Sequence, residues 1–181
     1  MIFKKQKIDG VFLISPEFHK DERGVFRRHF CEREFIKHGI VAKIEQANVS
    51  ENKLKYTLRG FHYQTGNHKE GKTLSCITGR IYDIIVDVRK SSPTFKQWIG
   101  FELSGKNRKT IHIPPGCANA FLTLEDNSII HYYCSKSYAP KFEKGIRYDD
   151  KYFNFKWPYK PKIISKKDLN HKNFKITDFL K

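Results

Sequence analysis

The segment at residues 81–88 decides the fold class, because its letters, IYDIIVDV, alternate between two faces as a β-strand does. One face is wholly apolar and carries Tyr82, Ile84, Val86 and Val88. The other face sets Asp83 and Asp87 among isoleucines. Two acids on an otherwise apolar face predict either a strand that faces water or a strand that lines a polar cavity inside a barrel.

The chain around this segment shows the same strand-and-turn rhythm. From residue 40 onward, short apolar runs are separated by Gly, Pro and Asn, which favours a β-sandwich or barrel over alternating strands and helices. A short helix is expected at residues 32–38, closed by Gly39. Ser165 to Asp168 resembles a helix-start capping box. After it, Phe174, Ile176 and Phe179 are expected to dock the terminal segment on the barrel.

Length, charge and cysteine content exclude several classes of protein. The 181 residues predict one domain that spans residues 1–181. The net charge of +16 favours polyanionic partners, but no nucleic-acid motif is present, so we expect a phosphorylated small molecule and no nucleic acid. No apolar run has membrane-spanning length and no export signal is recognisable, so we expect a cytoplasmic protein that does not bind a membrane. The four scattered cysteines predict reduced thiols.

The segment at residues 58–64, LRGFHYQ, carries the strongest signal of a functional site. His62 can exchange a proton near neutral pH, and Arg59 offers donors that match a phosphate. Strict alternation would place the two side chains on opposite faces of the strand. We therefore predict a bulge at Gly60 that brings both into one pocket.

Several motifs in register, over roughly residues 8 to 170, resemble the dTDP-4-dehydrorhamnose 3,5-epimerase family. They are DxRGxF at 21–26, QxN at 46–48, LRGFHYQ at 58–64, GxIYD at 79–83, SSPTF at 91–95, PPG at 114–116 and GIRYDD at 145–150. The resemblance implies an all-β cupin or jelly-roll antiparallel barrel with a few short helices, mainly near the C-terminus. It also implies a homodimeric enzyme without cofactor or metal, acting on a nucleotide-linked 4-keto-6-deoxy sugar.

The resemblance assigns catalytic roles to four residues. His62 would be the base that removes a proton beside the ketone, and Asp168 would orient it. Lys72 would stabilise the enolate oxygen, and Tyr132 would return a proton on the other face of the ring. Without the resemblance, Lys72 reads as a surface lysine, Tyr132 as a core aromatic and Asp168 as a helix cap.

The resemblance also assigns substrate-binding roles. Arg23 and Arg59 would hold the diphosphate, with Gln46, Asn48, Tyr138 and Glu143 lining the nucleotide region. The sequence departs from the family at two further binding positions. Asn119 stands where the family usually has a histidine, and an amide cannot titrate near neutrality. Arg28 replaces a glutamate that faces thymine. Because arginine suits the acceptors of guanine, GDP-linked 4-keto-heptoses are an alternative substrate class, with a solvent-facing Arg28 as the competing interpretation.

Three other functions compete with the epimerase. A metal-dependent cupin would use histidines such as His112 and His131, but neither forms an H-x-H pair. A binding module for sugar nucleotides or nucleic acids is motivated by the charge, but it has no use for a base, an acid and an enolate stabiliser. A sugar-nucleotide 3,4-ketoisomerase would share the substrate and yield a constitutional isomer.

Overall fold

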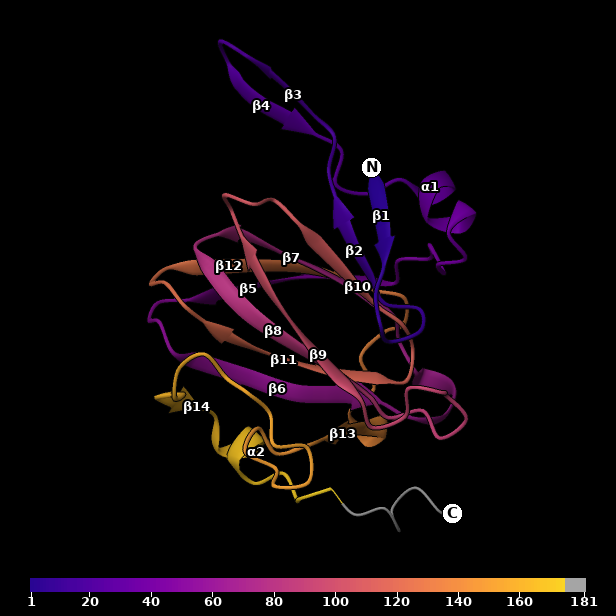
Figure 1. The fold of residues 1–181 in the computed structure, drawn as a ribbon, viewed down its shortest axis with the longest axis vertical. Coiled ribbons are helices and arrows are strands. Elements are labelled where there is room, and N and C mark those ends of the chain that lie inside the picture. The colour runs from indigo at the N-terminus through magenta and orange to yellow at the C-terminus, as the bar shows by residue number, and fades with distance from the viewer. Residues whose placement is uncertain (175–181) are drawn as a thin grey trace.

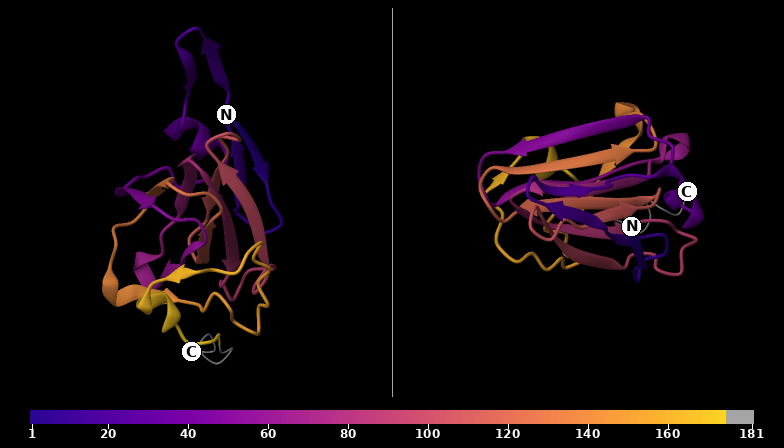
Figure 2. Two further views of the ribbon diagram at one scale, coloured as in Figure 1. Left: turned by 90° about the vertical axis from the view of Figure 1, so that its left-hand side faces the viewer. Right: turned by 90° about the horizontal axis from the view of Figure 1, so that it is seen from above.

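The computed structural model describes residues 1–174, which form two facing six-stranded β-sheets (Figure 1). The first sheet has the order β1 (Ile2–Lys5), β2 (Phe12–Ser15), β10 (Thr110–Ile113), β7 (Lys72–Thr78), β12 (Ser128–Cys134) and β5 (Gln46–Asn52). The second has the order β13 (Glu143–Gly145), β6 (Thr57–Gln64), β11 (Cys117–Thr123), β8 (Arg80–Asp87) and β9 (Trp98–Ser104), with β14 (Ile163–Ile164) also paired to β6. The all-β jelly-roll prediction is confirmed, although the strands form two layers and not one continuous barrel (Figure 2).

Helices are few and short. In the described part of the chain, α1 (Glu32–Lys37) lies near the N-terminus and α2 (Lys166–Leu169) near the C-terminal end, with 3₁₀ turns at Gly66–His68 and Pro140–Phe142. The helix predicted at residues 32–38 is therefore confirmed, as is the helix start at Ser165. None of the helices in residues 1–174 is long and apolar enough to cross a membrane. All four cysteines are free, as expected.

The main core lies between the sheets. Leu74, Ile111 and Ile130 of the first sheet pack against Ile81 and Ile85 of the second. At one end of this interlayer, polar side chains such as Gln46, Asn48 and Lys72 line a cavity.

The two acids of β8 face this interior and do not face water. Asp83 and Asp87 are both fully buried. Asp87 accepts hydrogen bonds from Arg89, Ser92 and Thr94, which satisfy it at one end of the strand. Asp83 lies nearer the open end of the interlayer and accepts a hydrogen bond from Asn119 at 3.0 Å. Of the two interpretations open from the sequence, the polar interior is the correct one.

A β-bulge at residue 61 interrupts the pairing of β6 with β11. His62 pairs with Asn119 and Gly60 pairs with Ala120, so Phe61 is an extra residue in β6. Gly60 has a φ of +113°, and a Cβ there would lie 2.7 Å from the Ala120 Cα. Only glycine fits this approach. The predicted bulge is confirmed, and it turns both Arg59 and His62 into one cavity.

Outside the interlayer, two segments pack on the sheets. Phe153 and Phe155 cover the outer face of β8 and β11, and Phe174 packs against the same cluster. Phe155 also stacks on Phe61 with ring centroids 4.3 Å apart. The docking predicted for Phe174 is thus confirmed, whereas Ile176 and Phe179 lie outside the described residues.

A hairpin of β3 (Phe18–Asp21) and β4 (Gly24–Arg27) extends beyond the sheets, on the side opposite to α2 (Figure 1). Its turn is the one predicted from residues 21–24. Phe26 and Phe18 on this hairpin are 73% and 52% exposed. An isolated two-stranded hairpin is marginally stable in water, so this element has the properties of a segment that packs against another surface.

Candidate functional site

A cavity of about 810 Å³ opens at the polar end of the interlayer. Its size is within the range of small-molecule sites. All but two of the residues assigned by the sequence line it: Gln46, Asn48, Arg59, His62, Lys72, Asn119, Tyr132, Tyr138, Glu143 and Asp168. The two that do not are Arg23 and Arg28.

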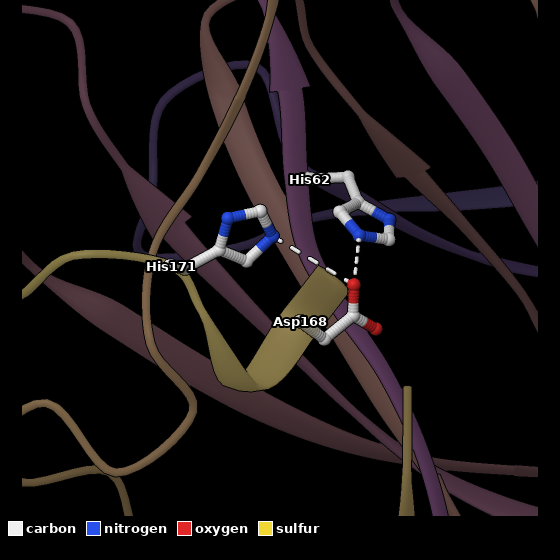
Figure 3. Close-up of side chains that lie close together, drawn as sticks. All are labelled: His62, Asp168 and His171. Carbon is white, nitrogen blue, oxygen red and sulfur yellow. Dashed lines mark hydrogen bonds and ion pairs between the residues drawn. The ribbon is translucent and has the colours of Figure 1, made fainter. Parts of the chain in front are cut away.

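His62 and Asp168 form a hydrogen-bonded pair at the wall of this cavity (Figure 3). The His62 Nε2 atom lies 2.8 Å from Asp168 Oδ1, and the Gly60 N–H donates to Asp168 Oδ2 at 3.1 Å. Burial works to raise the pKa of Asp168, which is 3% exposed, but the hydrogen bonds from His62 and Gly60 outweigh it and leave the pKa below its ordinary value. Asp168 is therefore ionised and accepts a hydrogen bond from the Nε2–H of His62, so the lone pair of the His62 ring is on Nδ1.

Asp168 reaches this position through the short helix α2. The Ser165 hydroxyl accepts a hydrogen bond from the Asp168 N–H at 3.0 Å, which caps the helix. Asp168 thus takes part in the helix cap through its backbone N–H, while its side chain is free to bind His62.

Lys72 extends into the cavity from β7, in the sheet opposite to His62. Its Nζ donates to the His62 carbonyl at 3.2 Å and to Asn119 Oδ1 at 3.4 Å, and it forms an ion pair with Glu70 at 3.1 Å. The Asn119 amide in turn donates to Asp83. Lys72 is therefore a positioned cation inside the cavity, and the interpretation of Lys72 as a surface lysine is wrong.

Asp83 stands behind Asn119 and does not line the cavity. Burial raises the pKa of its carboxyl to about 7, although the Asn119 hydrogen bond and the Lys72 charge both act to lower the pKa. Its Oδ2 atom is buried without a hydrogen-bond partner in residues 1–174. The amide at position 119 thus joins a buried acid to the cation that lines the cavity.

Tyr132 projects into the cavity from β12, and its strand belongs to the sheet that faces β6. Burial raises the pKa of the phenol, with a further contribution from Cys134. The side chain is therefore held in its protonated form. A protonated phenol and an imidazole base on opposing sheets can address opposite faces of a ring that lies between them.

A polar group of side chains closes the far part of the cavity. Gln46 donates to Asn48 at 2.9 Å and accepts from the Tyr138 N–H at 2.9 Å, and the Tyr138 hydroxyl donates to Glu143 at 2.6 Å. Nearby, the Arg59 Nε donates to the buried Asn52 at 2.9 Å, which fixes the guanidinium at the cavity edge. These residues can bind the polar groups of a nucleotide.

The two arginines of the hairpin region are turned away from their own cavity. Arg23 is paired with Asp21 at 2.6 Å, and its side chain is 85% exposed. Arg28 is paired with Glu34 at 3.0 Å, and its side chain is 61% exposed. Neither can contact a substrate bound in the cavity of the same chain.

The sequence reasoning missed three residues that matter for this site. Glu70 is buried beside Lys72, and Asn52 holds Arg59. His171 lies beside the hydrogen-bonded pair of His62 and Asp168, with its Nε2 3.7 Å from Asp168 Oδ1. Its position three residues after Asp168 was the available signal, because that spacing places two side chains on one face of a helical turn.

The two histidines considered as metal ligands lie elsewhere. His112 is buried and its Nδ1 is 2.9 Å from the Thr73 hydroxyl, while His131 packs against His29. Neither lines the cavity. The side chains therefore give no support to a metal centre formed by these two.

Comparison with known proteins agrees with this geometry. The family model of dTDP-4-dehydrorhamnose 3,5-epimerase matches residues 5–175. The curated dTDP-4-dehydrorhamnose 3,5-epimerase of Methanothermobacter thermautotrophicus is 39% identical over 173 residues, covering 94% of this chain and 92% of the relative.

Solved structures show the same likeness. The enzyme of that name from Bacillus anthracis, with TDP and PPi bound, superposes with a TM-score of 0.92 at 32% identity, covering 96% of this chain and 99% of the other. A dTDP-6-deoxy-D-glucose-3,5-epimerase from Legionella pneumophila, in complex with dTDP-4-keto-L-rhamnose, gives 0.90 at 35% identity, covering 95% and 92%. This chain therefore belongs to the dTDP-4-dehydrorhamnose 3,5-epimerase family and is an isomerase of the epimerase class.

Proposed function

We propose that this chain inverts C3 and C5 of a dTDP-linked 4-keto-6-deoxy sugar by removing and returning protons through an enolate. One observation carries the proposal. The hydrogen-bonded His62 and Asp168 and the protonated phenol of Tyr132 lie on opposite sides of one cavity, between facing sheets. The related enzymes from Bacillus anthracis, with TDP bound, and from Legionella pneumophila, in complex with dTDP-4-keto-L-rhamnose, support dTDP as the nucleotide.

The first step is removal of a proton from the carbon beside the ketone. Asp168 holds the Nε2–H of His62, so the lone pair on Nδ1 accepts the substrate proton. The electron pair of the broken C–H bond moves onto the ketone oxygen and forms an enolate. The Lys72 ammonium stabilises that negative charge in a site partly closed to water.

The second step returns a proton to the opposite face. Tyr132 donates its phenolic proton to the same carbon, which inverts the configuration. His62 then carries two ring protons and Tyr132 is a phenolate. Exchange of both groups with water restores the starting state, and the same pair acts at the second carbon after the ring has turned.

The hairpin suggests why the family is expected to be dimeric. Arg23 lies in the turn of the hairpin, and Phe18, Val25 and Phe26 of the hairpin are exposed, so we expect the hairpin to pack against a second copy of the chain. We place the hairpin of one protomer against the cavity of its partner, where Arg23 reaches the diphosphate. Arg28 at its base then lies near the nucleotide base.

The reaction is tested by proton NMR in deuterated water, with a dTDP-linked and a GDP-linked 4-keto sugar in parallel. Loss of the C3 and C5 signals of the dTDP sugar, abolished by His62→Asn, is the expected result. Loss of signal only with the GDP sugar would overturn the nucleotide assignment. No exchange with either substrate, while the variant binds dTDP as wild type does, would overturn the epimerase and favour a binding module.

The dimer is tested by complementation between two defective chains. His62→Asn lacks the base and Arg23→Ala lacks the hairpin cation. In a mixed dimer, the cavity with an intact His62 receives the intact Arg23 of its partner, so mixing should restore about a quarter of the wild-type rate after subunit exchange. If Arg23 acts on its own cavity, or not at all, mixing restores nothing beyond the average of the two.

A further inference from the structure

His171 adds a third metal-ligating group to the pair formed by His62 and Asp168. The ligand atoms of these three side chains lie within 4.8 Å of one another. His62 Nε2 is 2.8 Å and His171 Nε2 is 3.7 Å from the same carboxylate oxygen, Asp168 Oδ1 (Figure 3). Two imidazoles and one carboxylate that converge on a point are a ligand set that zinc and other first-row divalent ions accept.

The Nε2 atom of His171 has no hydrogen-bond partner among the described residues. It is buried, and no donor or acceptor in residues 1–174 forms a hydrogen bond with it. A buried polar atom without a partner is costly, and this one is directed at Asp168. In the tautomer that carries its proton on Nδ1, the His171 ring has a lone pair on Nε2 that a metal ion can accept.

The surroundings hold all three ligands in place. Asp168 is fixed through Oδ2 by the Gly60 N–H, which leaves Oδ1 for an ion. The His171 ring lies against Gly145, where an added Cβ would collide with it. The rings of His62 and His171 are 5.7 Å apart between centroids, with their planes at 77°. Outer contacts of this kind orient the ligands of metal sites.

We propose that His62, Asp168 and His171 form a zinc site, and that a zinc ion bound there inhibits the enzyme. Movements of the two rings would bring both Nε2 atoms and Asp168 Oδ1 to about 2.0–2.2 Å from one zinc ion, the usual length of zinc–nitrogen and zinc–oxygen bonds. The single negative charge of Asp168 beside two imidazole rings suits a divalent cation. Because His62 and Asp168 line the cavity, water from the cavity completes the coordination.

Inhibition follows from the proton on His62 and rests on the proposed function. A zinc ion on Nε2 takes the place of the Nε2 proton that His62 now donates to Asp168. That proton moves to Nδ1, so the ring stays neutral and no proton is released. Nδ1 then has no lone pair, and His62 can no longer accept a proton from the sugar.

The binding part is tested on the full chain without reference to activity. Equilibrium dialysis against buffered zinc is expected to give one ion per wild-type chain. His171→Asn should weaken this binding by at least about tenfold. His38→Asn, which removes an exposed histidine at the end of α1, should bind zinc as wild type does. Equal zinc binding by wild type and His171→Asn, or no zinc on wild type, would overturn the proposal.

Two further measurements guard against misfolding and separate this proposal from the epimerase assignment. In ¹⁵N-labelled wild type, zinc should shift the Nε2 signals of His62 and His171 and leave those of His38 unchanged; unshifted His62 or His171 would overturn the site. The epimerisation rate of wild type, divided by its own rate without metal, should fall as zinc is added, at the concentrations that fill the site. Zinc bound without any loss of rate would overturn inhibition, whereas zinc bound by a chain inactive on every sugar would overturn the epimerase alone.

Discussion

The Ser165 hydroxyl accepts the backbone N–H of Asp168 at 3.0 Å, so the cap of the last helix also positions the carboxylate that binds His62. The side chain and the backbone of Asp168 are therefore held by different partners. Both sets of contacts are needed because α2 is only Lys166–Leu169 and cannot be stable on its own.

Replacing Ser165 by Ala should affect both stability and rate. Loss of the cap is expected to cost about 1 kcal/mol in the free energy of unfolding. It should also lower kcat by about tenfold, because Asp168 then no longer fixes the proton on His62 Nε2. Ser165→Thr keeps the hydroxyl and should behave as wild type in urea unfolding and in rate. A full-rate Ser165→Ala enzyme would show that the cap does not position Asp168.

The parts of the fold that were predictable from sequence are those set by neighbouring residues. Alternation in residues 81–88 predicted a strand, Gly60 between Arg59 and His62 predicted the bulge, and Ser165 predicted a helix start. Each depends on a local rule of backbone geometry, which the sequence carries directly.

Contacts between distant strands were not predictable in this way. Asn119 pairs with Ile85 across β8 and β11, which puts Asp83 on the diagonal, within reach of its amide. That register depends on how two whole strands align, and no residue pattern states it. The direction of the hairpin was likewise not predictable, since the turn at residues 21–24 fixes the tip of the hairpin but not the direction of the Arg23 side chain.

Asp83→Asn should change the pH dependence of stability. In the folded protein the pKa of Asp83 is about 7, above its ordinary value. The contribution of the protonated carboxyl to the free energy of unfolding is therefore fully present below the pKa of the unfolded chain and is lost as pH rises through about 7. An amide of the same shape keeps the hydrogen bond from Asn119 and avoids burying a charge. Between pH 5 and pH 8, the free energy of unfolding of the variant should therefore rise, relative to that of wild type, by on the order of 2 kcal/mol.

Urea unfolding of both proteins at the two pH values measures this difference. Groups that titrate in both proteins cancel in the comparison, so only the carboxyl at position 83 contributes. The same stability difference at pH 5 and pH 8 would show that Asp83 ionises in the folded protein as it does in the unfolded chain.

Lys72→Met should remove stabilisation of the enolate while keeping the length of the side chain. The expected result is a fall in kcat of about 10²–10³-fold with little change in KM, because the charge acts mainly on the enolate. Lys106→Met, at an exposed position in the turn after β9, is the matched control for loss of one positive charge. A KM effect alone would place Lys72 in ground-state binding and not in catalysis.

Tyr132→Phe separates the two proton transfers, because it removes the acid and leaves the base, His62 with Asp168, intact. His62 can still take the proton and return one that it has exchanged with solvent, on the same face of the ring. In deuterated water the recovered substrate should therefore gain deuterium beside the ketone while its configuration is retained. His62→Asn should show neither deuterium uptake nor inversion. If Tyr132→Phe still yields the inverted sugar at the wild-type rate, the returning proton comes from another donor, and the two-sided arrangement of His62 and Tyr132 does not explain the reaction.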